Sequence, residues 1–289
     1  MVTKKTTAQK APNKKTCVRT TKKKDTPHIG LVTNDSYLAP YEDAIRGRHE
    51  HALWKIDQLT QNGKLSLSDF ANGHNYYGLH KTDEGWVFRE WAPNATEIYL
   101  VGDFNDWDEQ EQYRCHKIKD SGNWELTLPH DALAHGQYYK MRVHWNGGEG
   151  ERIPAWAQRV VQDEDNKIFS AQVWAPEKSY VWKKKTFKAQ TAPLLIYECH
   201  IGMAQDEEKV GSYNEFREKV LPRIIKDGYN AIQIMAIQEH PYYGSFGYHV
   251  SSFFAASSRF GTPEELKALI DEAHKNGIAV IMDIVHSHA

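Results

Sequence analysis

Cysteine is scarce in this 289-residue chain, and long apolar runs are missing from it. The three cysteines, Cys17, Cys115 and Cys199, are too scattered for a metal-binding motif or a disulfide framework, which suits a reducing compartment. No apolar run is long enough for a membrane span or a signal peptide. The sequence therefore predicts a soluble, cytoplasmic protein that does not bind a membrane.

The sequence also has no Gly-rich phosphate-binding loop, which is typical of nucleotide-binding proteins, and no nucleophile elbow, which is typical of esterases. Charge is nearly balanced, with 36 Lys and Arg against 38 Asp and Glu. Aromatic residues make up 12% of the chain, which fits sugar-binding platforms or the core of an ordinary β-sandwich. A length of 289 residues at 40% hydrophobic content predicts at least two domains.

The first 25 residues differ from the rest in composition, with eight Lys and one Arg against a single Asp. Such a segment buries too little apolar surface to offset its ordering entropy, so we predict a disordered basic tail over residues 1–30. A contact with an anionic surface or a targeting role is the alternative, although the tail has no amphipathic stripe. The remaining chain is acidic, so no basic face is left for nucleic acid.

Three short apolar runs, at 194–200, 231–237 and 278–288, have the pattern of strands that are covered on both faces of a parallel sheet. The segments between them are helical. One begins near Ser212, with Glu215 three residues on for a capping box, and ends at Gly228, with a kink or split expected at Pro222. The other begins with a capping box of Thr262 and Glu265 around Pro263, and Gly277 supplies a left-handed stop. Alternating strands and helices predict the opening of a (β/α)8 barrel or of an open doubly wound sheet.

The long aromatic connection 238–261 favours the barrel, because barrel active sites are built from loops that follow the strands. Three polar residues, Asp283, His286 and His288, end the third predicted strand. Their spacing is compatible with a metal site. On a strand, however, His286 and His288 share a face that Asp283 does not, so we predict no metal.

These segments, YECHIG, YNAIQIMAIQEHPYYGSFGYHVSSFFAASSRFGTPEEL and IMDIVHSHA, closely resemble the glycogen and starch branching enzymes of the α-amylase superfamily. The resemblance implies that Tyr248 stacks beneath the sugar at the cleavage point. It also implies that His288 hydrogen-bonds the 6-hydroxyl of that sugar, and that Asp283 orients the neighbouring catalytic groups. No cofactor is implied.

Residues 75–175 alternate aromatic and β-branched segments with turn signals, which predicts an immunoglobulin-like β-sandwich. FREWAPNATEIYLVGDFNDWD resembles the glycogen- or starch-binding-like module of branching and debranching enzymes. The resemblance places Trp91, Pro93, Trp107, Gly122 and Lys140 at glucan contacts. Trp107 could instead fill the sandwich core. One departure is that Asn123 stands where many relatives have Lys.

Two further segments complete the predicted organisation. Residues 31–74 have a helical pattern. In branching enzymes a similar segment contributes to glucan binding, and the resemblance places Asn62 at that contact. Residues 176–193 are polar and lysine-rich, which predicts a linker without a site.

The resemblance implies an enzyme that cleaves α-1,4-glucan with retention and transfers the chain to a glucan 6-hydroxyl. Its two reacting carboxylates come from the fourth and fifth barrel strands, so residues 194–289, with three βα units, are expected to contain neither. We therefore expect the first part of a truncated barrel with no catalytic residue of its own. The alternatives are a glucan-binding fragment and part of a hydrolytic relative.

Overall fold

The computed structural model describes residues 30–119, 121–188 and 193–287, in two compact units that divide after Ala71. Within these ranges no helix is both long enough and apolar enough to cross a membrane. The predicted basic tail, residues 1–30, lies almost wholly outside the described residues. The two units are described separately below.

The first unit is helical, as the sequence predicts. It contains α1 (Gly30–Asn34), the 3₁₀ turn η1 (Ser36–Tyr41), α2 (Glu42–Leu59) and α3 (Leu67–Phe70). Large apolar side chains of α2 are exposed, including Leu53 at 48% and Trp54 at 52%. The described residues of this unit, 30–71, therefore form no hydrophobic core of their own.

The second unit begins with a sandwich of two antiparallel sheets, after the short turn η2 (Gly73–Asn75). One sheet has the order β1-β2-β5-β4, formed by Gly78–Thr82, Gly85–Trp91, Asn123–Leu128 and His116–Lys117. The other has the order β3-β6-β9-β8, formed by Ala95–Gly102, Tyr138–Trp145, Phe169–Gln172 and Val160–Gln162. In addition, β7 (Gly148–Arg152) pairs with β6, and the turn η3 (Glu111–Tyr113) precedes β4.

Inward-facing side chains of both sheets form the sandwich core, as the alternating pattern requires. On β2, Trp86, Phe88 and Glu90 are buried while the residues between them are half-buried or exposed. Phe88, Ile98 and Leu100 are fully buried. The segment 151–162, which has a polar, bridge-like sequence, also belongs to the sandwich, because it supplies β8 and the buried Arg159.

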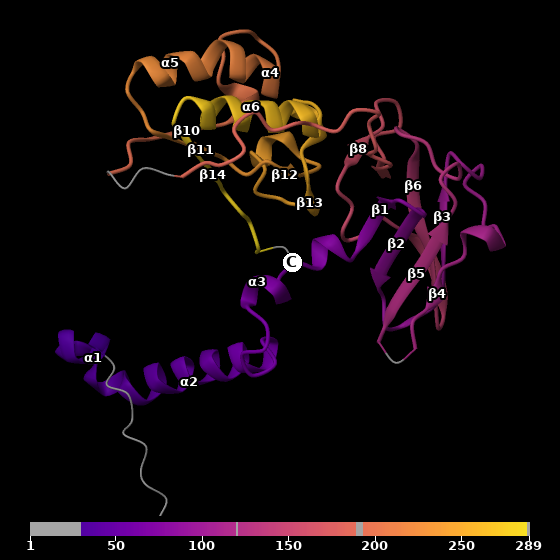
Figure 1. Ribbon diagram of the computed structural model, residues 1–289, viewed down its shortest axis with the longest axis horizontal. Coiled ribbons are helices and arrows are strands. Elements are labelled where there is room, and N and C mark those ends of the chain that lie inside the picture. The colour runs from indigo at the N-terminus through magenta and orange to yellow at the C-terminus, as the bar shows by residue number, and fades with distance from the viewer. Residues whose placement is uncertain (1–29, 120, 189–192, 288–289) are drawn as a thin grey trace, which may run out of the picture. The chain divides into compact units, whose positions relative to one another are not determined.

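Three parallel strands follow, in the order β10-β11-β14: Ile196–Cys199, Ala231–Ile234 and Ala279–Met282. They are in register, with Ile196 opposite Ala231 and Ala231 opposite Ala279. Each lies within one of the three predicted apolar runs. The sheet is open, and its helices lie on one side of it (Figure 1). This part of the chain therefore has the opening of the predicted barrel.

The first crossover helix is divided, as Pro222 predicts. It consists of α4 (Tyr213–Glu215), a π-helical turn η5 (Phe216–Val220) and α5 (Leu221–Lys226). Ser212 and Glu215 form the expected capping box at its start. Pro222 cannot donate a backbone hydrogen bond, and the irregular turn comes directly before the segment that contains it.

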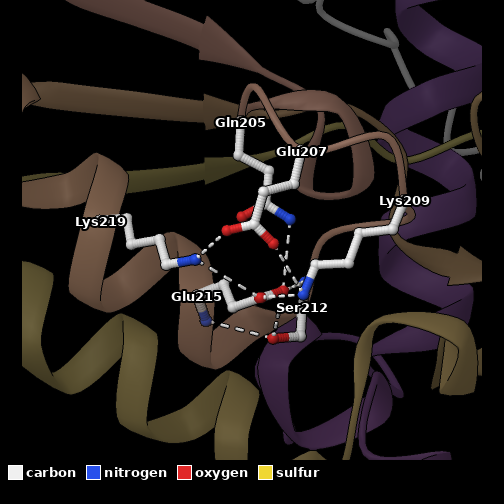
Figure 2. Close-up of polar contacts among 6 residues, drawn as sticks. All are labelled: Gln205, Glu207, Lys209, Ser212, Glu215 and Lys219. Carbon is white, nitrogen blue, oxygen red and sulfur yellow. Dashed lines mark hydrogen bonds and ion pairs between the residues drawn. The ribbon is translucent and has the colours of Figure 1, made fainter.

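Figure 2 shows how the loop before this helix is attached to it. Lys209 lies 2.5 Å from Glu215 and 3.1 Å from Glu207, and Lys219 of η5 lies 2.6 Å from Glu207. Gln205 donates a hydrogen bond to Glu215 over 3.3 Å. These contacts join the loop that follows η4 (Ile201–Met203) to the helix.

The second crossover helix, α6 (Pro263–Lys275), begins with the predicted capping box of Thr262 and Glu265. Beyond it, Gly277 has a φ of +77°, which confirms the predicted left-handed stop. The connection 238–261 is more ordered than an open loop. It forms an antiparallel pair, β12 (Gln238–Glu239) with β13 (Ser252–Ala256), and the turns η6 (Tyr243–Ser245) and η7 (Ser258–Phe260).

The strap 176–188 is held on α6 by one carboxylate and one stacked ring. Asp271 is 2% exposed and accepts hydrogen bonds from the Tyr180 hydroxyl and from the backbone N–H groups of Lys183 and Lys184, over 2.7–2.8 Å. Most of the strap's other side chains are exposed. The Phe187 ring also stacks on His274 of α6, with the ring centres 4.1 Å apart. The described part of the predicted linker is therefore anchored on α6 rather than free along its length.

Candidate functional site

Tyr248 and Asp283, which the sequence places 35 residues apart, are in direct contact. The Tyr248 hydroxyl donates a hydrogen bond of 2.8 Å to Asp283 Oδ2. Gln233 of β11 donates a second, also of 2.8 Å, to Asp283 Oδ1. Asp283 follows β14 directly, so the carboxyl end of this sheet brings the three side chains together.

The chain path before Tyr248 requires glycine. Phe246 and Gly247 both have left-handed backbones, with φ values of +54° and +89°. A Cβ atom at Gly247 would lie 1.6 Å from the carbonyl oxygen of Ala236, so the turn can contact the backbone between β11 and β12 only without a side chain there. This close approach fixes where the half-buried ring of Tyr248 begins.

Burial, and then the hydrogen bond to the Asp283 carboxylate, raise the pKa of Tyr248 to about 12. The hydroxyl therefore stays protonated at neutral pH and acts as a donor. Asp283 uses both oxygens to accept hydrogen bonds from Tyr248 and Gln233, an arrangement suited to fixing orientation. His286 is exposed, and His288, the third predicted residue of this site, lies outside the described residues.

Three of the sandwich residues predicted to contact glucan also lie together. Gly122 has a φ of +73°, and a Cβ atom there would lie 3.0 Å from Pro93 Cβ and 3.1 Å from Trp91 Nε1. Trp91 is 58% exposed, so its indole offers an apolar face of the kind that a pyranose ring can cover. Asn123 accepts a hydrogen bond of 2.9 Å from the Tyr77 hydroxyl. The residue that replaces Lys therefore has a structural partner.

The other two predicted sandwich residues, Trp107 and Lys140, line a separate hollow of about 290 Å³. The Lys140 ammonium lies 5.8 Å from the centre of the Trp107 ring and 2.9 Å from Glu151. The hydrogen bond from Lys140 holds the pKa of Glu151 below its ordinary value. Trp107 is half-buried and lies outside the hydrophobic core, so it does not fill the sandwich interior.

The loop that presents Trp107 is held from inside by Asn105, which is 3% exposed. Its side chain accepts from the Gly102 N–H and donates to the carbonyl oxygens of Leu100 and Asp108, over 2.8–3.0 Å. Asp106 and Trp107 both have left-handed backbones, with φ values of +53° and +62°. These conformations are costly for residues with a Cβ atom, so the loop depends on the Asn105 hydrogen bonds.

Sequence reasoning missed several residues around this hollow. Asp103 accepts from the Trp107 indole over 3.1 Å and from the Tyr138 N–H over 2.6 Å. Asp163, Asn166 and Ser170 add polar groups from the hairpin of β8 and β9. Asp103 and Asn105 belong to the GDFNDW motif. Asp and Asn side chains often hydrogen-bond the backbone of tight turns, so these two residues could have been predicted to do so. The others come from residues distant in sequence.

Asn62, the remaining predicted glucan contact, is exposed in the turn that follows α2 of the first unit, with a φ of +59°. The turn is closed by Thr60, whose hydroxyl accepts from the Gly63 N–H over 3.1 Å. Asn tolerates this left-handed conformation better than most residues. The structure thus describes eight of the nine predicted site residues. Seven of them, in the second unit, form one pair, one trio and one further pair, and Asn62 belongs to the first unit.

Comparison with known families gives two matches along the chain. Residues 76–157 match carbohydrate-binding module 48, the isoamylase N-terminal domain, and residues 205–289 match the alpha amylase catalytic domain. Among solved structures, the pullulanase from Bacillus acidopullulyticus has a TM-score of 0.59 at 19% identity, covering 74% of this chain and 30% of that one. The catalytic module of the glycogen-degrading pneumococcal virulence factor SpuA has a TM-score of 0.58 at 20% identity, covering 72% and 37%. Both confirm the fold.

Curated relatives are more similar. The 1,4-alpha-glucan-branching enzyme of Dictyostelium discoideum is 42% identical over 274 residues, which cover 92% of this chain and 40% of the relative. That of Yarrowia lipolytica is 45% identical over 273 residues, covering 90% and 38%. The chain thus spans about two fifths of the length of these relatives. Along most of its length the chain is similar to 1,4-alpha-glucan-branching enzymes, and it consists of a sandwich that matches carbohydrate-binding module 48 followed by the opening of a barrel that matches the alpha amylase catalytic domain.

Proposed function

We propose that this chain forms the glucan-binding part of a glycogen or starch branching enzyme. In that reaction one carboxylate attacks the anomeric carbon of an α-1,4-linked chain with retention, and the chain is then transferred to a glucan 6-hydroxyl. The contact between Tyr248 and Asp283 carries the proposal, because it places an aromatic ring and an oriented carboxylate at the carboxyl end of the barrel strands.

In this proposal the barrel end contributes the floor of the sugar site. Tyr248 offers a ring face to the apolar side of a pyranose, and Asp283 directs its charge and hydrogen bonds toward the reacting groups. His288 would bind the 6-hydroxyl of the same sugar. The two reacting carboxylates would come from strands that follow β14, so we propose that these 289 residues alone neither branch nor hydrolyse glucan.

The sandwich would hold the polymer while the barrel acts on it. Trp91, Pro93 and Gly122 would form one contact with glucan, and Trp107 with Lys140 a second. The exposed indole of Trp91 and the ammonium of Lys140 supply the apolar face and the hydroxyl partner that a glucan needs. Asn62 would add a polar contact from the helical segment. We also infer a cytoplasmic location, because the two described cysteines, Cys115 and Cys199, are free and buried.

Activity is tested on the complete protein. Iodine staining and linkage analysis after incubation with amylose should reveal new α-1,6 branches without a rise in free reducing sugar. Hydrolysis without branching would instead assign a hydrolytic relative. The 289-residue chain should give neither product, and any transfer or release of glucan by it would contradict the proposed division of roles.

Binding is tested on the chain itself, by sedimentation with glycogen or insoluble starch. Trp91→Ala and Trp107→Ala should each lower the bound fraction, by roughly threefold to tenfold for a lost aromatic platform. Trp182→Ala is the matched control, because Trp182 is 39% exposed and lines a different hollow, between the strap and α6. Equal losses for all three variants would remove the support for the two sandwich sites.

A further inference from the structure

The side chain of His144 lies between two carboxylates beside the Trp107 hollow. Its Nε2 lies 2.8 Å from Glu109 Oε1, and its Nδ1 lies 3.0 Å from Glu149 Oε2. Glu109 is in the loop that presents Trp107, two residues further along the chain. Glu149 is on β7, the strand that also carries Glu151, the ion-pair partner of Lys140. His144, on β6, therefore links the two segments that carry this hollow's side chains.

The chemistry of the imidazole ring determines when both contacts exist. An ionised carboxylate only accepts hydrogen bonds, and a neutral imidazole has a single N–H group. With carboxylates at both nitrogens, a neutral ring would direct one lone pair at one of them. The Nε2–Glu109 contact is a hydrogen bond, and the Nδ1–Glu149 contact is an ion pair at 3.0 Å. Both carboxylates therefore attract the ring most strongly when it is protonated, because both nitrogens then carry a hydrogen.

The groups on the neighbouring strands are compatible with this charge. Glu97 of β3 is the register partner of His144, and the Tyr99 ring meets the imidazole edge-on at 6.0 Å. The Tyr99 hydroxyl donates to Glu97 over 2.8 Å, and Arg114 lies 3.4 Å from the same carboxylate. Arg114 also lies 3.4 Å from Glu111. His144 thus stands near three carboxylates, and the nearby arginine is paired with acidic groups.

A metal ion is the competing occupant. Among the residues that the structure describes, Glu109, His144 and Glu149 are the one group of potential ligands whose atoms lie within 4.8 Å of one another. The two carboxylates face different ring nitrogens, however, whereas a metal ion binds a single nitrogen of a histidine. Chelation by all three residues would require one glutamate to leave its present contact. The arrangement therefore fits a proton better than a metal.

We propose that His144 is a positioning residue of the Trp107 glucan site, and that this site binds glucan more tightly when the His144 ring carries a proton. As an imidazolium, His144 ties the Trp107 loop to the β6–β7 hairpin through Glu109 and Glu149. When the ring loses its proton, one tie is lost and the loop is held less firmly against Lys140. This inference rests on the proposed function of the sandwich as a glucan-binding module.

The test measures the affinity of the full 289-residue chain for maltoheptaose by calorimetry at about pH 5.5 and about pH 8, on either side of the ordinary histidine range. We expect affinity to be weaker at the higher pH by roughly threefold to tenfold, because one charge-assisted contact is lost. His144→Gln should bind with the same weakened affinity at both values. His116→Gln, an exposed histidine on β4, is the matched control and should keep the full pH dependence.

A second measurement does not depend on glucan. The indole N–H resonance of Trp107, assigned with Trp107→Phe, should shift with the same midpoint as the His144 ring resonances, and Glu109→Gln should abolish the coupling. Trp107→Ala could leave glucan binding intact while, in the wild-type chain, the Trp107 and His144 resonances still shift with the same midpoint. In that case the glucan site is wrong and the positioning role of His144 stands. Equal affinity at both pH values in a chain that needs Trp107 would overturn the inference. So would stoichiometric binding of Zn²⁺ that His144→Gln removes.

Discussion

The indole ring of Trp156 lies nearly parallel to the ring of Phe254, with the ring centres 4.1 Å apart and 17° between the planes. Trp156 follows β7 of the sandwich, and Phe254 lies on β13, in the connection that also carries Tyr248. Tyr77 stacks on the same indole at 5.2 Å. The sandwich and the barrel segment are therefore joined through aromatic contacts.

This stack should contribute measurably to stability. In a double-mutant cycle, Trp156→Leu and Phe254→Leu should show a coupling energy of about 0.5–1.5 kcal/mol, as expected for an aromatic pair beyond its buried area. Urea unfolding of the two single variants and the double variant measures it. A parallel cycle with Trp156 and Phe216, which lies in η5, should give additive effects. Additivity in the first cycle would mean that the two rings only share a boundary.

The Asn105 hydrogen bonds should determine the conformation of the Trp107 loop. Asn105→Ala leaves three backbone groups without their partners and should lower the free energy of unfolding by roughly 2–4 kcal/mol. The matched variant Asp106→Gly should be neutral or stabilising, because glycine adopts the observed φ of +53° without strain. Thermal unfolding checks both. A loop that tolerates Asn105→Ala as well as Asp106→Gly would contradict this account.

The ion-pair network in Figure 2 should make the barrel segment sensitive to acid. The hydrogen bond from Lys209, followed by those from Ser212 and Gln205, lowers the pKa of Glu215 to about 2 from 4.5. Because the folded-state pKa is the lower one, this group stabilises the fold above about pH 4.5 and loses that effect as pH falls through about 2.

The variant Glu215→Gln keeps an oxygen for the capping box and removes the charge. The difference in urea midpoint between the wild type and this variant should be largest near neutral pH and should shrink as the pH is lowered. High salt should also reduce it, because the charges are close to solvent. Glu208→Gln, at an exposed position in the same loop, should show no such pH dependence. A pH-independent difference would assign Glu215 a capping role alone.

The open sheet should be the least stable part of the second unit. Leu195, Ile196, Met282 and Ile284, on or beside its two edge strands, are 42–58% exposed, and such edges pair readily with other chains. We expect limited proteolysis to cut within residues 193–287 well before the sandwich. Mass spectrometry of the early fragments locates the cuts. Equal resistance of both parts would contradict the prediction.

Local signals made much of the fold predictable. The sequence signals at Thr262, Pro263 and Glu265 locate the start of α6, and Gly277 locates its end. These signals are local, because a helix cap depends only on side chains a few residues away in the sequence. Pro222 likewise predicted the divided helix. The pairing of β12 with β13 was not predictable, because two very short strands meet across a long turn and neither has a distinctive pattern.

The sequence predicted which residues belong to the candidate sites, but it predicted little of how their side chains contact one another. The resemblance placed Trp107 and Lys140 at glucan contacts, but the left-handed backbone of Trp107 depends on buried hydrogen bonds of Asn105. The contact of His144 with Glu109 spans 35 residues and has no periodic signal. Asp283 and Tyr248 were assigned separate roles, and their direct hydrogen bond forms only when the turn between β12 and β13 meets the end of β14.

That hydrogen bond gives a final prediction, about the ionisation of Tyr248. Burial, and then the hydrogen bond to Asp283, raise its pKa to about 12, so the stability it contributes is present below the ordinary pKa of 10 and is lost as pH rises through about 12. Asp283→Asn removes the charge and should lower the pKa of Tyr248, as followed by NMR of the ring Cζ. Tyr180, which hydrogen-bonds Asp271 and also has a pKa of about 12, should keep its value. If Tyr248 titrates unchanged in Asp283→Asn, burial alone sets its pKa, and Asp283 does not control the proton of this ring.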